Sequence, residues 1–286
     1  MLDCLLHLPP AARDAAYDNT RAVATSAAQL AALEARSAAL VADHPQALLD
    51  APYGVSEREC YDFFASGQPG AATLLFIHGG YWQMRHKNTF RAVVDGALQQ
   101  GLHGALIGYT LAPSASLTQI VAQVLQGIAA VRRQALALGG SGDIVLCGWS
   151  AGGHLTALGL NAPGVVAGLG ISGIYDLAPL QHNYLNVALQ LRPSEVQALS
   201  PLRLEVVAKP LVIGYGTAEL PQLQAQSQVF AQHRQAVPQD VIAVVDADHF
   251  SILQALERAD GVLLQRLLAV AGLATAPHVR SQACAC

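Results

Sequence analysis

The chain alternates short runs of apolar residues with longer runs in which apolar residues recur at helical spacing. The short runs predict strands at Cys60–Phe64, Thr73–Ile77, Ala105–Tyr109, Ile144–Cys147, Val165–Gly170, Leu211–Gly214 and Val241–Val245. The longer runs predict helices at Thr89–Gln100, Leu117–Leu138, Ala151–Leu160, Leu223–Ala236 and Ser251–Leu268. Strands that alternate with helices in this way are typical of βαβ units. The pattern therefore predicts an α/β fold, with a mostly parallel central sheet and helices on both faces.

Two segments interrupt this alternation. Residues 1–50 are rich in alanine, and we expect them to form an N-terminal helical arm. Residues 177–209 are polar and contain three prolines, and we expect them to form a small helical cap on the main domain, which spans residues 51–276. Residues 277–286 show no periodicity and are expected to form a disordered tail. Either segment could cover a site.

The composition favours a large folded domain that binds neither nucleic acid nor a membrane. Hydrophobic residues make up 52% of the 286 residues and charged residues only 13%, which is sufficient for a sizeable core. The net charge is −4 and the chain contains two lysines, so no basic stripe is available for a phosphate backbone. The uncharged stretch from Leu155 to Tyr175 is interrupted by Pro163 and Gly164. We therefore expect a buried helix, a turn and a buried strand there instead of a membrane span.

The cysteines and the N-terminus indicate a reducing compartment. The five cysteines (Cys4, Cys60, Cys147, Cys284 and Cys286) have no spacing that suggests a disulfide framework or a zinc site. The first residues lack the basic and apolar regions of a secretory leader, so a cytoplasmic location is expected. Cys284 and Cys286 could bind a soft metal, but an unstructured tail is the simpler interpretation.

The strongest chemical signal is the segment Gly148-Trp149-Ser150-Ala151-Gly152, which lies between a predicted strand and a predicted helix. This G-x-S-x-G pattern is typical of a nucleophile elbow, in which a serine occupies a strained turn and needs small flanking residues. The start of the following helix also favours developing negative charge. The alternative interpretation is an ordinary turn rich in glycine and serine, but such a turn need not lie between a strand and a helix.

A second signal, His78-Gly79-Gly80-Tyr81-Trp82, directly follows a predicted strand. Acyl transfer needs N–H donors aimed at the oxyanion, and a Gly-Gly pair allows backbone N–H groups to approach a substrate. We assign the oxyanion hole to Gly79, Gly80 and Tyr81 together with Ala151, the residue after the serine. His78 is a candidate base, but a role in holding this loop is preferred.

The base and the acid are expected after the last strands. His249 lies between the final predicted strand and the C-terminal helix, where the chain order serine, acid, histidine places the base. Glu219 follows the preceding strand and is the preferred acid, and Asp246 and Asp248 remain alternatives. Four residues that flank these loops are assigned to a substrate pocket, although core packing is an alternative role for them: Trp82, His154, Tyr175 and Phe250.

Taken together, these motifs resemble the α/β-hydrolase superfamily, and within it the His-Gly-Gly-x-Trp branch that includes kynurenine formamidase and related bacterial esterases. Further segments resemble later or earlier blocks of that branch: Ala16–Arg21, Ser172–Leu177, Ser200–Leu202 and Asp248–Leu253. The resemblance implies a serine, acid and histidine mechanism for Ser150, Glu219 and His249, with no metal and no organic cofactor. The acid is frequently Asp in this superfamily, whereas the matching block here offers Glu219.

The sequence thus predicts a serine hydrolase that cleaves small esters or arylformamides through an acyl-enzyme. One alternative is a general carboxylesterase without formamidase activity. Another is a catalytically silent ligand-binding protein on the same fold, because a fold does not determine function. The expected partner is a small-molecule ester or amide substrate, and the sequence leaves a homodimer open.

Overall fold

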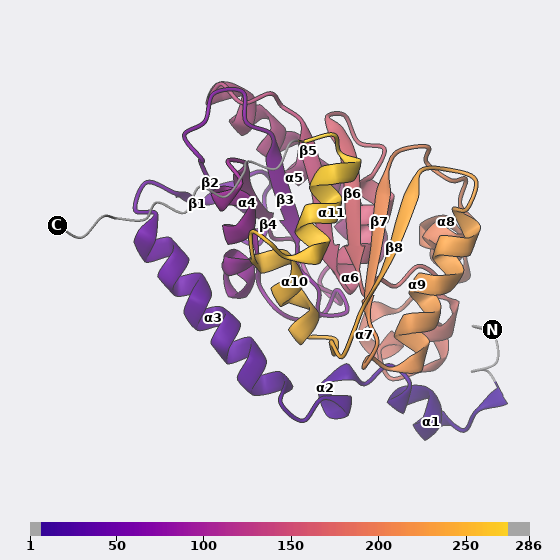
Figure 1. Cartoon of the computed structure of the whole chain (residues 1–286). Coiled ribbons are helices and arrows are strands. Elements are labelled where there is room, and N and C mark those ends of the chain that lie inside the picture. Colours follow the sequence, from indigo (N-terminus) through magenta and orange to yellow (C-terminus); the bar gives the residue numbers. More distant parts are fainter. Residues whose placement is uncertain (1–6, 274–286) are drawn as a thin grey trace.

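A computed structural model describes residues 7–273 and contains an eight-stranded central sheet (Figure 1). The strands are β1 (Leu48–Pro52), β2 (Cys60–Phe64), β3 (Thr73–Ile77), β4 (His103–Ile107), β5 (Ile144–Trp149), β6 (Val165–Ile171), β7 (Leu211–Gly216) and β8 (Gln239–Val244). Their order across the sheet is β1-β2-β4-β3-β5-β6-β7-β8. The predicted tail and its two cysteines lie outside the described residues.

The sheet is mostly parallel, which confirms the predicted fold class. Strands β4, β3, β5, β6, β7 and β8 pair in parallel, whereas β1 and β2 form an antiparallel edge. Strand β1 was not predicted from the sequence, because residues 48–52 include an aspartate and a proline and lack a continuous apolar run. An edge strand tolerates such residues, since one of its sides has no ladder partner.

Alternate side chains of the central strands enter two separate cores. In β3, Leu75 and Ile77 pack in one core, and Leu74 and Phe76 pack in the other. This period of two means that both faces of the sheet are covered, which explains why the strand is apolar throughout.

Helices cover the two faces as the alternation predicts (Figure 1). One face packs against α5 (Leu117–Ala137), α6 (Ala151–Gly159) and α9 (Pro221–His233). The other packs against α3 (Ser26–Asp43), the 3₁₀ helix η2 (Lys87–Val94), α4 (Asp95–Gln99), α10 (Gln254–Glu257) and α11 (Val262–Val270).

Two predicted helices are broken in the structure. The segment predicted as Thr89–Gln100 is the 3₁₀ helix η2 followed by α4, and the segment predicted as Ser251–Leu268 is η5 (Ser251–Leu253), α10 and α11. The second break falls at Gly261, where a Cβ atom would lie 2.3 Å from the carbonyl oxygen of Ala255. Apolar periodicity does not report such a turn, because the residues on both sides of it still face the same core.

The N-terminal segment and the cap segment lie against each other. The first contains α1 (Pro10–Ala15) and α2 (Asn19–Ala22) ahead of α3, and the second contains η3 (Ala178–His182), α7 (Asn186–Leu189), α8 (Pro193–Leu199) and η4 (Pro201–Arg203). The backbone N–H of Tyr184 donates to Asp14 Oδ1 at 2.8 Å. Tyr17 is fully buried. The chain immediately before α2 is therefore anchored in the protein core.

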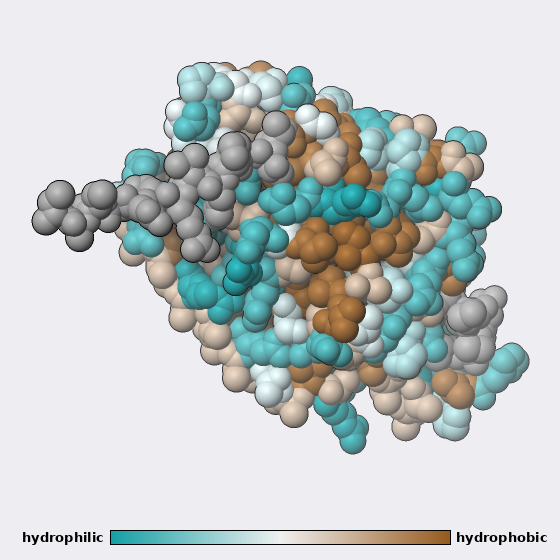
Figure 2. Space-filling model, in the orientation of Figure 1, coloured by the Kyte–Doolittle hydropathy of each residue, from teal (hydrophilic) through white to brown (hydrophobic). Residues whose placement is uncertain are grey.

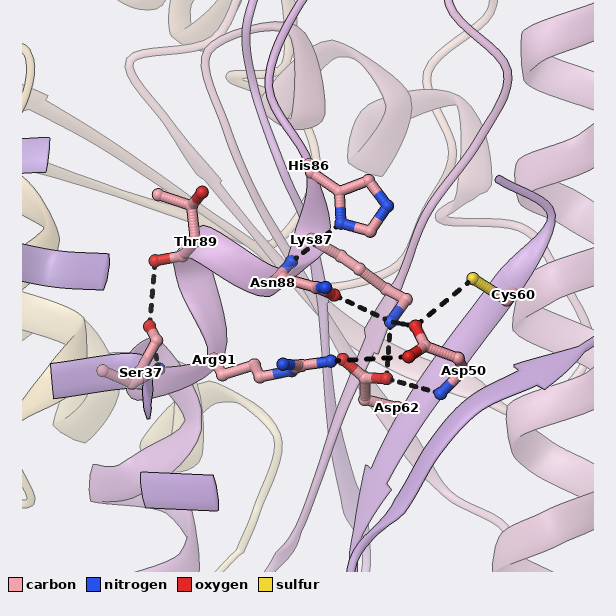
Figure 3. Close-up of polar contacts among 10 residues, drawn as sticks. Ser37, Asp50, Cys60, Asp62, His86, Lys87, Asn88, Thr89 and Arg91 are labelled. Carbon is pink, nitrogen blue, oxygen red and sulfur yellow. Dashed lines mark hydrogen bonds and ion pairs between the residues drawn. The ribbon is translucent and has the colours of Figure 1, made fainter. Parts of the chain in front are cut away.

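A group of charged and polar residues around two buried side chains joins the antiparallel edge to η2 (Figure 3). We call Asp50, Asp62, Lys87, Asn88 and Arg91 the Lys87 cluster. Lys87 Nζ donates to Asp62 at 2.5 Å, to Asp50 at 2.6 Å and to Asn88 at 3.1 Å, and Arg91 Nε donates to Asp62 at 2.7 Å. The side chains of Lys87 and Asp62 are both fully buried. Because an ammonium group has three N–H donors, every donor of Lys87 is paired.

Apolar residues also gather on the face that carries α11 and β8 (Figure 2). There Ile242 and Val244 of the edge strand are only partly buried against the core. Helices therefore cover the sheet less completely at β8 than at its centre. Among residues 7–273, no helix combines the length and the apolar character needed to cross a membrane.

Candidate active site

Ser150 lies in the sharp turn between β5 and α6 and has a backbone conformation of φ 57° and ψ −116°. A serine with positive φ is strained, and such strain is typical of a nucleophile elbow. The flanking glycines are required by contact: a Cβ at Gly148 would lie 2.1 Å from the Gly152 carbonyl oxygen, and one at Gly152 would lie 2.0 Å from that of Ile77. The turn can form here because glycine occupies both flanking positions, where any side chain would clash with the backbone.

The loop that follows β3 lies directly against this turn. A Cβ at Gly79 would lie 2.6 Å from the Trp149 carbonyl oxygen and 3.0 Å from Ser150 Cβ. The next residues Gly80, Tyr81 and Trp82 have positive φ values of 110°, 49° and 56°. Ala151 begins α6, where the first backbone N–H groups have no partner within the helix. The candidate oxyanion donors of both loops are thus adjacent to Ser150.

His78 is fully buried and stacks on the ring of Tyr109, with ring centroids 4.4 Å apart. Its Nδ1 lies 2.7 Å from the Gly79 carbonyl oxygen, and the Tyr109 hydroxyl donates to the His78 carbonyl oxygen at 2.9 Å. Burial lowers the pKa of His78 to about 3, so the ring is neutral at physiological pH. These contacts hold the glycine loop, which is the role preferred for His78 from the sequence.

His249 and Glu219 form a buried pair. His249 Nδ1 lies 3.1 Å from Glu219 Oε2, and the two side chains are 4% and 0% exposed. The other carboxylate oxygen, Glu219 Oε1, accepts hydrogen bonds from Ser172 Oγ at 2.6 Å and from the Gly216 N–H at 2.7 Å. This arrangement fixes the carboxylate, which in turn orients the imidazole.

The alternative acids have other roles in the structure. Asp248 accepts hydrogen bonds from the backbone N–H groups of Phe250 and Ser251 and from Gln29. Burial alone would raise the pKa of Asp248, but these hydrogen bonds outweigh it and leave the pKa below its usual value. Asp246 is exposed. Geometry therefore places Glu219, and neither aspartate, against the histidine.

Trp149 was not singled out from the sequence, although it occupies the second position of the elbow motif. Its indole N–H donates to the His249 carbonyl oxygen at 2.7 Å, and the two rings lie 4.9 Å apart. A residue of the β5 elbow thus holds the backbone of the histidine loop. The position of Trp149 beside Ser150 in the motif was the one sequence feature that could have indicated a role at the site.

A small cavity of about 20 Å³ joins these groups, and we call it the Ser150 cavity. Its lining residues come from α2, from the glycine loop, from the elbow and from the histidine loop: Asn19, Thr20, Gly80, Tyr81, Met84, Arg85, Trp149, Ser150, His249 and Phe250. A larger cleft of about 630 Å³ lies between the start of α5 and residues 188–195, away from Ser150. Ser150 lines the smaller space and does not line the larger cleft.

The structure brings only one of the four tentative pocket residues to this cavity. Phe250 lines it, whereas Trp82, His154 and Tyr175 are fully buried in the core. His154 Nε2 lies 2.7 Å from the Leu199 carbonyl oxygen, and burial lowers the pKa of His154 to about 4. Four further lining residues were not predicted from the sequence as part of the site: Asn19 and Thr20, which lie in the segment Ala16–Arg21, and Met84 and Arg85, which lie outside its motifs.

Arg85 places a positive charge on the wall of the Ser150 cavity. Burial lowers the pKa of its guanidinium group from the usual value of 12.5, and the side chain is only partly exposed. Asp and Glu are absent from the ten described residues that line the cavity. Within residues 7–273, no group of three or more His, Cys, Asp or Glu side chains is arranged to hold a metal ion.

Comparison with known proteins defines the class of fold. A family model described as BD-FAE matches residues 64–163. A putative thioesterase from Silicibacter sp. superposes with a TM-score of 0.82 at 25% identity, over 88% of this chain and 97% of that protein. Esterase B from Lactobacillus rhamnosus superposes with a TM-score of 0.65 at 18% identity, over 87% and 97% of the two chains. The chain has the α/β-hydrolase fold.

The sequence is also similar to those of two fish enzymes. Kynurenine formamidase from Danio rerio is 29% identical over 245 residues, which cover 79% of this chain and 83% of that protein. Kynurenine formamidase from Salmo salar is 28% identical over the same shares of the two chains. The resemblance inferred from the motifs is therefore confirmed.

Proposed function

We propose that this protein is a serine hydrolase that removes a small acyl group from an arylformamide or an ester. Ser150 attacks the carbonyl carbon, His249 accepts the Ser150 proton and passes it to the leaving group, and Glu219 orients the imidazole. The N–H groups of Gly79, Gly80, Tyr81 and Ala151 are the candidate donors to the oxyanion. The observation that carries the proposal is the buried Glu219–His249 pair, whose histidine lines one cavity with the strained Ser150.

The size of the Ser150 cavity favours a small acyl group. A volume of about 20 Å³ is close to that occupied by one or two water molecules. A formyl group carries only hydrogen on its carbonyl carbon, so it needs less room beside Ser150 than any other acyl group. The similarity to kynurenine formamidases supports the same choice, and the similarity to esterases supports hydrolysis in general.

The charge of the cavity favours an acidic substrate. Arg85 lines the cavity, where a substrate carboxylate would be its natural counter-ion. N-formylkynurenine carries a formamide, an aromatic ring and a carboxylate, and it is the substrate we propose. General carboxylesterase activity is the second candidate, because the superposed structures include esterases.

Labelling with a fluorophosphonate, followed by kinetics on two substrates, tests this proposal. We expect stoichiometric labelling of Ser150, loss of labelling in Ser150→Ala, and normal labelling in Ser114→Ala, in which an exposed serine is replaced. We then expect kcat/KM to be higher for N-formylkynurenine than for phenyl acetate. Ester turnover with negligible formamide cleavage would identify a carboxylesterase, and absence of labelling would indicate a ligand-binding protein.

A further inference from the structure

Asn19 belongs to the Ser150 cavity although it lies about 130 residues from the serine in sequence. It begins α2, is only 4% exposed and lines the cavity together with Ser150 and His249. The fully buried Tyr17 anchors the chain two residues earlier. Asn19 is therefore held over the catalytic groups by a fixed segment of the N-terminal arm.

Hydrogen bonds determine which end of the Asn19 amide faces which way. The Tyr81 hydroxyl donates its single proton to the Tyr17 carbonyl oxygen at 2.5 Å. That hydroxyl can then only accept from Asn19, so the amide nitrogen of Asn19 must face Tyr81, and Nδ2 donates to it at 2.9 Å. The orientation of the amide follows from this chain of three groups and places Oδ1 away from Tyr81.

Asn19 Oδ1 is buried and has no hydrogen-bond partner among the described residues. A buried carbonyl without a donor is costly, and most buried polar atoms in folded proteins are paired. Because Asn19 lines the Ser150 cavity, a molecule bound there could supply the missing donor. The donor has to be an N–H or O–H group close to the reacting carbonyl.

We propose that Asn19 is a specificity-determining residue whose Oδ1 accepts a hydrogen bond from the N–H of the scissile amide. This inference rests on the proposed function and restricts it to N-acyl arylamines. When the tetrahedral intermediate collapses, the nitrogen must direct its lone pair to His249, and its own hydrogen then points elsewhere and needs an acceptor. An ester oxygen has no hydrogen at this position, so an ester cannot use Asn19 in the same way.

With formanilide as the substrate, the proposed reaction has two stages, formation of a formyl ester on Ser150 and its hydrolysis. Ser150 Oγ bonds to the formyl carbon, its proton moves to His249, and the carbon–nitrogen bond then breaks as His249 returns that proton to nitrogen. The amine leaves with its original hydrogen, which Asn19 has held, and with the new one. Water then cleaves the formyl ester of Ser150 and releases formate.

Formanilide and phenyl formate provide a matched pair, because they share the acyl group and the ring and differ only in N–H against O. We expect Asn19→Ala to lower kcat/KM for formanilide by about 10- to 100-fold and to change kcat/KM for phenyl formate by less than about threefold, after correction for spontaneous hydrolysis. Arg21→Ala is the control, because it replaces an exposed side chain of the same short helix. Equal losses on both substrates, or no loss on formanilide, would overturn the inference.

A second variant guards against a folding defect in Asn19→Ala. Tyr81→Phe keeps Asn19 and the loop backbone but removes the hydroxyl that orients the amide. We therefore expect a smaller loss of kcat/KM than in Asn19→Ala, and again a larger loss on formanilide than on phenyl formate. If wild-type Ser150 is labelled and phenyl formate is cleaved but formanilide is not, the inference fails while the serine hydrolase stands. If Ser150 is not labelled and neither compound is cleaved, both proposals fail.

Discussion

The Lys87 cluster and the Ser150 cavity both contain buried polar groups, but they differ in how completely these groups are paired. In the Lys87 cluster each ammonium donor has an acceptor, and both carboxylate oxygens of Asp62 accept from a cation. In the Ser150 cavity the serine backbone is strained and Asn19 Oδ1 has no partner among the described residues. Complete pairing stabilises one arrangement, whereas incomplete pairing leaves groups available to a substrate.

The position of the Lys87 cluster shows how the two regions depend on each other. Lys87 follows the loop that begins at His78, and its contacts fix the end of that loop to β1 and β2. His78 fixes the start of the loop through Gly79 and Tyr109. The candidate oxyanion donors therefore lie on a segment held at both ends by hydrogen bonds.

Glu219→Gln should have the largest effect on activity among changes that keep the fold. The neutral amide removes the charge that stabilises the imidazolium, so we expect kcat to fall by about 10³-fold or more. Asp248→Asn is the matched control, and we expect less than about a threefold change, because Asp248 bonds to backbone N–H groups instead of His249. If Asp248→Asn lowered kcat more than Glu219→Gln in steady-state kinetics, Asp248 would be the acid.

Lys87→Met should have the largest effect on stability. It removes one of the two cations that pair with the buried Asp62, which keeps Arg91 and the backbone N–H of Asp50, and breaking a buried ion pair costs about 3 kcal/mol or more in the free energy of unfolding. We expect kcat/KM of the folded fraction to change by less than about tenfold. Urea unfolding measures the first quantity, with Arg133→Met as the control at an exposed position. A stability equal to that of wild type would show that the cluster contributes nothing.

Acidification should destabilise the protein through its buried histidines. His78 has a pKa of about 3 in the folded protein against an ordinary value of 6.5, so below pH 6.5 the unfolded chain binds a proton that the folded chain does not. The free energy of unfolding therefore falls as pH decreases from 6.5 towards 3, by about 1.4 kcal/mol per pH unit for this site. Urea unfolding at pH 7 and pH 5 should show a shallower dependence in His78→Phe, which keeps an aromatic ring against Tyr109. An unchanged slope in this variant would contradict the prediction.

Arg85→Gln should have the smallest of these effects and should act on binding. Loss of one partly exposed charge is expected to raise KM for N-formylkynurenine by about three- to tenfold, with little change in kcat. KM for formanilide, which has no carboxylate, should remain the same. A similar rise for both compounds would mean that Arg85 shapes the cavity and does not recognise charge.

The sequence by itself determined the elements whose signals are local. The strand Thr73–Ile77 is apolar throughout because both faces of the sheet are covered, and its predicted bounds agree with β3. The elbow around Ser150 could be located because its glycines are required within five consecutive residues. The proposed order of serine, acid and histidine along the chain could likewise be predicted, because each residue follows a predicted strand.

Only the tertiary structure decided which residues meet at the site. Glu219 and His249 are 30 positions apart but lie within hydrogen-bond distance. The roles of Glu219 and Asp248 also differ through distant residues, because Ser172 and Gly216 donate to Glu219 whereas Gln29 donates to Asp248. Trp82, His154 and Tyr175 looked equivalent to Phe250 along the chain, yet only Phe250 reaches the cavity. Asn19 lies in the segment Ala16–Arg21, but nothing in the sequence marked it within that segment, because its contact with Tyr81 is visible only in the structure. Local patterns specify what a segment forms, whereas contacts between distant segments specify which of its side chains remain unpaired.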